Sequence, residues 1–302
     1  MIHCKLSWKK IITVIVVFIS IITIVGCSNN TNQATNNNSQ TNIGDSKGII
    51  NIGEVTWAED VAVSNLWKVL LEDQGYNVKL TQLDLAPLYV GLNKGDINIF
   101  FDAWLPTTQQ AYWSQYQSNL DDYGSWYEEA KIGIVVPKYV DINSIVDLEA
   151  NKDKFSGKII GIDPGAGIMK AAGMACSDYS LDDFKIIQGS EAAMISSLEK
   201  AYNNGEWIAI TGWSPHWIFA KYDLKFLDDP KNSFGNSEKL HMIGNKDFAA
   251  QYPEITERIK RFKMTDKQIG SLEELITNGM DPQDAAKKWI SDNQDVVNTW
   301  IE

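Results

Sequence analysis

The sequence predicts an α/β protein of two lobes with a cleft between them, and three observations support this fold class. Strand-like and helix-like segments alternate from residue 48 onward, which is typical of a largely parallel sheet. Two strand-like runs, 130–137 and 240–244, are placed to cross between lobes. The portion after residue 252 reads as helices only and therefore needs a sheet to pack against.

The boundaries of the lobes follow from the two crossings. Lobe 1 is expected to combine 48–136 with 241–302, and lobe 2 is expected to comprise 137–240. At 302 residues, 44% of them hydrophobic, the chain is long enough to form the cores of two such lobes.

The first lobe reads as alternating strands and helices. Apolar residues at helical spacing, Trp67 among them, indicate a helix that ends at Gly75, and we expect Trp67 to lie in the core. The strands are expected at 49–56, 76–83 and 97–101, and a second helix at 87–94.

The second lobe and the tail follow the same reasoning. Strands are expected at 158–162 and 184–188, helices near 144–150, after Gly167 and at 191–202, and a further strand leading to Trp213. The tail contains a helix at 253–262, one opened by a capping box at Thr265 and Gln268, and one opened by Asp281 and Pro282. The acidic, aromatic stretch 121–129 is interpreted as a loop.

The N-terminus resembles a bacterial lipoprotein signal. Lys5, Lys9 and Lys10 precede an uncharged run that reaches Gly26, and this run is shorter than the ~20 residues that a membrane span needs. We predict that 1–26 is a signal peptide, that Cys27 becomes the lipidated first residue, and that 27–47 is a disordered tether. The alternative is an uncleaved anchor helix.

Net charge and cysteine content exclude one class of ligand and one kind of cross-link. The formal net charge is −12, and it becomes −15 without the three lysines of the signal. Such an acidic chain is not suited to binding nucleic acid. After processing only Cys27 and Cys176 would remain, so that with Cys27 lipidated no intramolecular disulfide is possible. Cys176 is interpreted as a small buried hydrophobic residue.

Three strand-like runs end near a tryptophan. In two of them, at Trp104 and Trp213, a proline follows two residues later. Proline cannot donate to a sheet ladder, so these strands should stop near the tryptophan at the carboxyl edge of the sheet, where ligands bind in open α/β folds. The third run, 49–56, is followed directly by Trp57, which we expect at the same edge of the sheet. An aromatic cage is one interpretation of these residues, and ordinary core packing is the other.

A glycine-rich turn follows the strand at 158–162. The stretch 163–168, Asp-Pro-Gly-Ala-Gly-Ile, places backbone N–H groups at a helix start, where they can bind an anion. Its spacing fits neither Walker A nor G-x-G-x-x-G, so a small carboxylate suits it better than a phosphate or a dinucleotide. The turn can equally be an ordinary connection without a ligand.

A cage and an anion site together favour a ligand with a cation at one end and a carboxylate at the other. A quaternary ammonium group cannot donate a hydrogen bond but is attracted to aromatic faces, by about 2 kcal/mol for each desolvated face. Three tryptophans could thus supply roughly 6 kcal/mol, whereas micromolar binding needs about 8 kcal/mol. The carboxylate end must therefore contribute as well.

No enzyme, cofactor or metal pattern is found in the sequence. After the signal only His216 and His241 remain, with no cysteine or histidine at metal-ligand spacing, and no nucleophile elbow is present. A second class nevertheless stays open, a surface-anchored hydrolase that stacks sugars on tryptophan. Its acid–base residues would come from one acidic stretch: Asp121, Asp122, Glu128 and Glu129.

Four motifs in order resemble those of the glycine betaine-binding proteins of osmoprotectant ABC importers, the OpuAC family. They are Trp57-Ala-Glu, Asp102-Ala-Trp-Leu-Pro, Gly161-Ile-Asp-Pro-Gly-Ala-Gly-Ile-Met and Thr211-Gly-Trp-Ser-Pro-His-Trp. The similarity covers essentially all of 48–302.

The resemblance implies a type II periplasmic-binding-protein-like fold. It also implies a monomeric solute-binding lipoprotein on the extracytoplasmic face of the cell membrane, one that delivers its solute to an ABC permease. It assigns the trimethylammonium cage to Trp57, Trp104 and Trp213 and the carboxylate-binding N–H groups to Gly167 and Ile168. Trp217, one helical turn beyond Trp213, is expected to pack rather than bind.

One position departs from the family pattern. Some members carry a carboxylate-binding histidine five residues after the first Trp-x-Pro tryptophan, and here that residue is Gln109. Its amide can donate a hydrogen bond but cannot become cationic. Gln109 is therefore predicted either to bind the carboxylate more weakly or to indicate another ligand, such as choline or carnitine.

Overall fold

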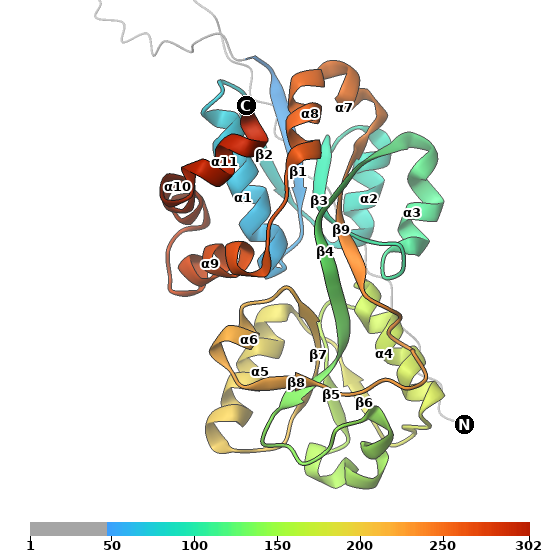
Figure 1. The fold of residues 1–302 in the computed structure, drawn as a ribbon. Helices are drawn as coiled ribbons and strands as arrows, with labels where there is room; N and C mark the ends of the chain where they lie inside the picture. The colour runs from blue at the N-terminus through green and yellow to red at the C-terminus, as the bar shows by residue number, and fades with distance from the viewer. Residues whose placement is uncertain (1–46) are drawn as a thin grey trace, which may run out of the picture. The chain divides into compact units, whose positions relative to one another are not determined.

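The computed structural model describes residues 47–302 (Figure 1). The predicted signal peptide, Cys27 and the tether up to residue 46 lie outside the described residues. Within 47–302, no helix is long and apolar enough to cross a membrane.

The strands of the described chain form one mixed sheet of nine strands in the order β2-β1-β3-β9-β4-β7-β5-β6, with β8 paired to β4. They are β1 (Ile49–Glu54), β2 (Asn77–Gln82), β3 (Ile99–Leu105), β4 (Leu120–Pro137), β5 (Lys158–Ile160), β6 (Lys185–Ile187), β7 (Ala209–Ser214), β8 (Leu224–Phe226) and β9 (Glu238–Asn245). The predicted alternation of strands and helices is confirmed.

The first half of the sheet contains β2, β1 and β3 in parallel, followed by β9 and β4 in antiparallel pairings. Helix α1 (Ala58–Glu72) joins β1 to β2, and α2 (Leu85–Lys94) joins β2 to β3. In Figure 1, α1 lies on one side of these strands, while α2 and α3 (Gln110–Tyr116) lie on the other. Trp67 is fully buried against Phe101 and Phe262, as expected for a core residue.

The second half of the sheet places β6, β5 and β7 in parallel, with β7 antiparallel to β4. Helix α4 (Gly167–Asp178) joins β5 to β6, and α5 (Glu191–Asn204) joins β6 to β7. The helix expected near 144–150 is present as two 3-10 segments, Ile145–Asp147 and Glu149–Phe155.

Strand β4 belongs to both halves of the sheet. Its residues from Leu120 to Ala130 pair with β9, and those from Lys131 onward pair with β7 and β8. The prediction that 130–137 crosses between the halves is confirmed. The prediction of a loop at 121–129 is wrong, because this stretch pairs with β9 and buries Tyr123, Trp126 and Tyr127 while its acids face outward or pair with basic side chains.

The C-terminal portion is helical after β9. It consists of α7 (Lys246–Gln251), α8 (Pro253–Arg261), α9 (Asp266–Thr277), α10 (Pro282–Asp292) and α11 (Gln294–Ile301). The capping box of Thr265 and Gln268 opens α9, and Asp281 caps α10 ahead of Pro282, as predicted. Helices α9 and α10 pack on α1, so the tail returns to the first half of the sheet (Figure 1).

Candidate ligand-binding site

The three tryptophans singled out by the sequence stand at the ends of three strands. Trp57 follows β1 as the N-cap residue of α1. Trp104 and Trp213 are the next-to-last residues of β3 and β7. The following residues, Leu105-Pro106 and Ser214-Pro215, are both joined by cis peptide bonds. Each strand therefore stops where its proline cannot extend the ladder, and its indole is left at the strand end.

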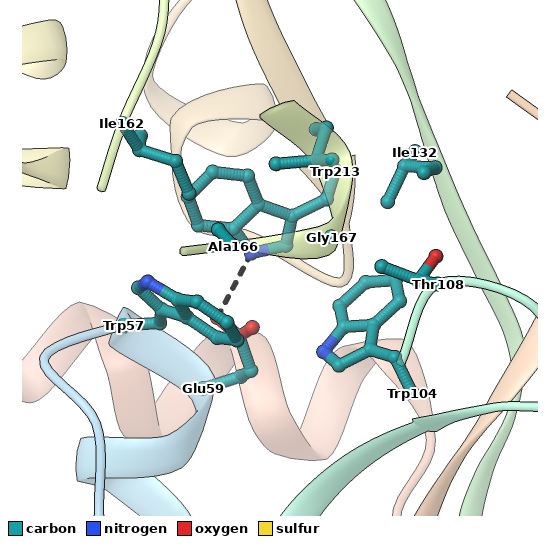
Figure 2. A pocket seen from close by; sticks show the side chains of 10 residues that line it. Trp57, Glu59, Trp104, Thr108, Ile132, Ile162, Ala166, Gly167 and Trp213 are labelled. Atoms are coloured by element: carbon teal, nitrogen blue, oxygen red, sulfur yellow. Dashed lines mark hydrogen bonds between the residues drawn. The ribbon is translucent and has the colours of Figure 1, made fainter. Parts of the chain in front are cut away.

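These three side chains line one cavity (Figure 2). The ring centroids of Trp57 and Trp213 are 6.5 Å apart, with the planes inclined by 55°. Trp104 lies across the cavity from Trp57 in Figure 2. The rest of the wall comes from both halves of the sheet: Glu59, Thr108, Ile132, Ile162, Ala166, Gly167 and Ile168.

The cage is well shielded from solvent. The exposed fractions of Trp57, Trp104 and Trp213 are 6%, 3% and 3%. Electrostatic attraction grows in such a low-dielectric setting, and cation–π contacts are worth most when both partners are desolvated. The arrangement can therefore hold a small cation without donating a hydrogen bond to it.

Two cage indoles donate their N–H groups to buried carboxylates. Trp213 Nε1 donates to Oε2 of Glu59 at 2.9 Å, the contact drawn in Figure 2. Trp104 Nε1 lies 3.1 and 3.2 Å from the two carboxylate oxygens of Asp102. A hydrogen bond to a buried partner fixes the ring, so these carboxylates orient two of the three aromatic faces.

Burial raises the pKa of both carboxyl groups, Asp102 and Glu59. Loss of solvation raises the pKa of Asp102 to about 8 despite the bond from Trp104, and nearby carboxyls add to the effect. Burial likewise raises the pKa of Glu59 well above its ordinary value, and the neighbouring Asp102, Glu191 and Glu273 raise it further. Glu59 is fully buried, yet its Oε1 has no hydrogen-bond partner.

The glycine-rich turn contributes Ala166, Gly167 and Ile168 to the wall of the cavity. Helix α4 begins at Gly167 with Ala166 as an N-cap that provides no side-chain bond. Among the hydrogen bonds of residues 47–302, none uses the N–H of Gly167 or Ile168. Both residues line the cavity, so two free donors and the positive end of a helix border the space beside the cage.

Gly167 also marks the closest approach of the two halves at this site. A Cβ built on Gly167 would lie 2.2 Å from the carbonyl O of Thr108, so only glycine fits there. The loop that carries Thr108 is held by Glu238, which accepts from the N–H groups of Thr107 at 3.1 Å and Thr108 at 2.9 Å and from the Thr108 hydroxyl. A second cavity shares Thr108 and Gly167 with the first and continues toward Lys170.

Gln109 lies apart from the cavity. Its side chain is fully buried, donates from Nε2 to the carbonyl O of Asp102 at 3.0 Å, and accepts at Oε1 from the Tyr89 hydroxyl at 2.9 Å. It is absent from the cavity wall. In this structure the amide thus supports the strand end beneath Trp104 and does not face the free N–H groups of α4.

The remaining singled-out residues lie outside the cage. Trp217 is partly buried near Tyr222 and does not line the cavity, in keeping with the expected packing role. His216 is buried against Trp213, with ring centroids 4.7 Å apart. His241 pairs with Asp122 at 2.9 Å. Cys176 is partly buried, with its pKa raised by burial.

The acidic stretch considered for a hydrolase provides no pair of carboxyls across a cavity. Asp122 is paired with His241, and Glu128 forms ion pairs with Lys239 and Lys263 at 2.6 and 2.9 Å. None of the four acids lines the tryptophan cavity. The structure therefore gives no support to the hydrolase alternative.

The sequence analysis missed the roles of Glu59 and Asp102. Both stand two residues from a cage tryptophan, in Trp57-Ala-Glu and Asp102-Ala-Trp. This spacing next to a candidate cage is the signal that could have identified them. Nothing in the sequence, however, brings Glu59 to Trp213, which is 154 residues away.

Comparison with known proteins identifies a family. The profile of the OpuAC family, the substrate-binding domain of ABC-type glycine betaine transport systems, matches residues 48–292. The glycine betaine/carnitine transport binding protein GbuC of Listeria monocytogenes is 42% identical over 164 residues. That match covers 53% of this chain and 55% of the Listeria protein, so the chain spans about half the length of this curated relative.

Two solved structures are similar over most of the described residues. Lactococcal OpuAC, in its closed conformation with glycine betaine, is 36% identical with a TM-score of 0.79, covering 84% of this chain and 100% of that one. The glycine/betaine/L-proline-binding protein ProX of Borrelia burgdorferi is 32% identical with a TM-score of 0.81, covering 84% and 97%. The fold is thus periplasmic-binding-protein-like, as predicted, and the chain belongs to the OpuAC family of transporter substrate-binding proteins.

Proposed function

We propose that this protein captures glycine betaine, or a closely related quaternary ammonium osmoprotectant, outside the cytoplasm and delivers it to the permease of an ABC importer. The observation that carries the proposal is a cavity lined both by three indoles from three strand ends and by the two residues at a helix start whose N–H groups are free. A zwitterion with a quaternary ammonium group and a carboxylate matches both ends of this space.

The cation end of the ligand is assigned to Trp57, Trp104 and Trp213. Three desolvated aromatic faces supply roughly 6 kcal/mol. The carboxyl group of Glu59, whose Oε1 has no hydrogen-bond partner, belongs to a residue of the same cavity wall. The aromatic cage and its carboxylate together favour a fully methylated cation over a neutral group.

The carboxylate end is assigned to the backbone N–H groups of Gly167 and Ile168. Hydrogen bonds to a charged group contribute about 1.5–3 kcal/mol each, so two of them raise the total above the ~8 kcal/mol of micromolar binding. Gln109 is left outside the contact set, because its amide is already bonded to Tyr89 and Asp102.

The proposed delivery to the permease depends on two lobes. The first lobe combines 48–136 with 241–302, and the second comprises 137–240. Trp57 and Trp104 come from the first and Trp213 and the α4 donors from the second, so a ligand between them holds the lobes together. A permease can recognise this closed form. We assign the protein to the extracytoplasmic face of the membrane as a monomer, tethered by a lipid on Cys27.

The test is a titration of the purified domain with glycine betaine, choline, carnitine and proline betaine, followed by calorimetry and tryptophan fluorescence. Saturable binding with a clear preference for the betaines is expected, because only they fill both ends of the site. Absence of a saturable response to all four compounds would contradict the proposal.

A choline or carnitine receptor is the second candidate, and one observation favours keeping it. With Gln109 turned inward, the carboxylate end relies on backbone donors alone. Choline binding as tightly as glycine betaine would assign the protein to this second class.

A further inference from the structure

A group of buried carboxyls surrounds the cation end of the cavity. Glu59, Asp102, Glu191 and Glu273 are exposed by 0%, 0%, 5% and 1%. They come from α1, β3, α5 and α9, and we call them the carboxyl cluster. Only Glu59 lines the cavity itself.

Three of the four members form hydrogen bonds with the cage or with the residue after Trp57, whereas neither carboxyl oxygen of Glu273 has a hydrogen-bond partner. Glu59 and Asp102 accept the indole N–H groups of Trp213 and Trp104. Glu191 accepts the backbone N–H of Ala58 at 3.1 Å, next to Glu59 in the chain. Charge on any one of these carboxyls is therefore felt by the others across a dry interior.

No lysine or arginine balances the charge of the cluster among residues 47–302. None of its members forms an ion pair with such a side chain. A basic group beside the cluster is His216, whose Nε2 lies 3.2 Å from Glu191 and whose Nδ1 accepts the N–H of Ile218.

Uncompensated buried charge is costly, so the cluster keeps part of its protons when the cavity holds no cation. Burial raises the pKa of Glu273 to about 8, as it does for Asp102, and burial together with nearby like charges raises the pKa of Glu59. The other titratable groups that act on these carboxyls are Asp60, Glu238 and Tyr89, none of which is a cation.

We propose that Glu59 is the counter-ion of the bound cation and that entry of a quaternary ammonium group expels a proton from the carboxyl cluster to solvent. The balance is simple: the cavity gains one positive charge from the ligand, a carboxylic acid loses H⁺, and Glu59 faces the cation as a carboxylate. Capture thereby becomes sensitive to pH and selective for charge as well as for shape. This inference rests on the proposed function.

Calorimetry of the wild-type domain measures the proton directly. Glycine betaine is titrated near neutral pH in phosphate and in Tris, whose ionisation enthalpies differ greatly. The observed binding enthalpy should differ between the buffers by an amount that corresponds to release of a substantial fraction of one proton. Affinity should also fall as pH is lowered from about 8 to about 6, by at most about tenfold for each pH unit.

An isostere with an uncharged head group separates the charge of the ligand from its shape. In 3,3-dimethylbutanoate a carbon replaces the ammonium nitrogen, so the molecule has the shape of glycine betaine without its positive charge. It should bind more weakly and release no proton. Tetramethylammonium, which lacks the carboxylate, should release a proton as glycine betaine does.

Two variants test whether proton release depends on the carboxyl group of Glu59. Glu59→Gln keeps an acceptor for Trp213 but cannot ionise, so proton release should be lost and the preference for glycine betaine over its isostere should fall at least about tenfold. Glu54→Gln is the matched control, since Glu54 is also buried with its pKa raised to about 7, yet it bonds Asn65 and lies off the cavity. It should retain proton release.

The outcomes differ for the two proposals. Betaine binding with the same enthalpy in both buffers overturns the inference and leaves the proposed function in place. Full proton release in Glu59→Gln overturns the role of Glu59. Absence of binding by any quaternary ammonium compound overturns both.

Discussion

Trp213 and Glu59, which are 154 residues apart, meet at 2.9 Å through an indole N–H and a buried carboxylate oxygen. This bond joins β7 of one half of the sheet to the first turn of α1 in the other. It fixes the position of the Trp213 ring relative to the carboxyl group of Glu59.

Replacement of Trp213 by alanine should weaken glycine betaine binding at least about tenfold, because one cation–π face of about 2 kcal/mol is lost. Circular dichroism and thermal unfolding should show a folded protein. Trp217→Phe is the control, since Trp217 lies off the cavity, and its affinity should match the wild type. Loss of folding in Trp213→Ala would make Trp213 a core residue instead.

Gly167→Ala should lower ligand affinity about tenfold or more, because its Cβ would meet the carbonyl O of Thr108 at 2.2 Å and force the two halves apart. Gly173→Ala in the same helix is the matched control. A Cβ at Gly173 meets nothing within 4 Å, so this change should leave binding unaltered and stabilise the fold by up to about 1 kcal/mol. Equal affinities in the two variants would contradict the close approach at Gly167.

Gln109→Leu should destabilise the fold by about 1–3 kcal/mol, since it leaves the Tyr89 hydroxyl and the carbonyl O of Asp102 without their buried partner. The ratio of betaine to choline affinity should stay within about twofold of the wild type. Gln117→Leu, at an exposed position, serves as the control for denaturant unfolding. A selective loss of betaine binding would instead assign Gln109 to the carboxylate.

The stability of the ligand-free protein should fall as pH rises from about 4 to about 8. Glu273 and Asp102 have pKa values of about 8 in the fold, against about 4 when unfolded, so the folded state holds more protons across this interval. Their stabilising contribution is fully present below about pH 4 and is lost above about pH 8.

Denaturant unfolding at several pH values measures this trend. Glu273→Gln should flatten it, whereas Glu274→Gln, at the exposed neighbouring residue, should not. Stability that rises with pH over the same interval would contradict a protonated cluster in the ligand-free fold.

Sequence periodicity and turn chemistry were sufficient for most of the fold. Prolines after Trp104 and Trp213 end β3 and β7, and the caps at Thr265 and Asp281 open α9 and α10 as predicted. The stretch 121–129 was misjudged as a loop because its acids mask the burial of Tyr123 and Trp126. Local polarity cannot show that β9 will pair with this segment.

The site was less predictable than the fold. The three cage tryptophans share a strand-end position, which is a local property visible in the sequence. The inward turn of Gln109 depends on Tyr89, and the place of Glu59 depends on Trp213, so both are set by tertiary contacts. An acidic residue in the first turn of a helix, such as Glu59 in α1, is ordinarily explained by the helix dipole alone. The sequence therefore gives no sign that Glu59 also accepts the indole N–H of Trp213.

Strand β4 changes its hydrogen-bonding partner from β9 at Ala130 to β7 at Lys131, between two adjacent residues. The strand that both halves share is thereby divided at a single peptide. Under the proposed function, a solute of a few ångströms bound beside this point would set the angle between two large surfaces. A membrane partner would then need to sense only that angle, without touching the solute.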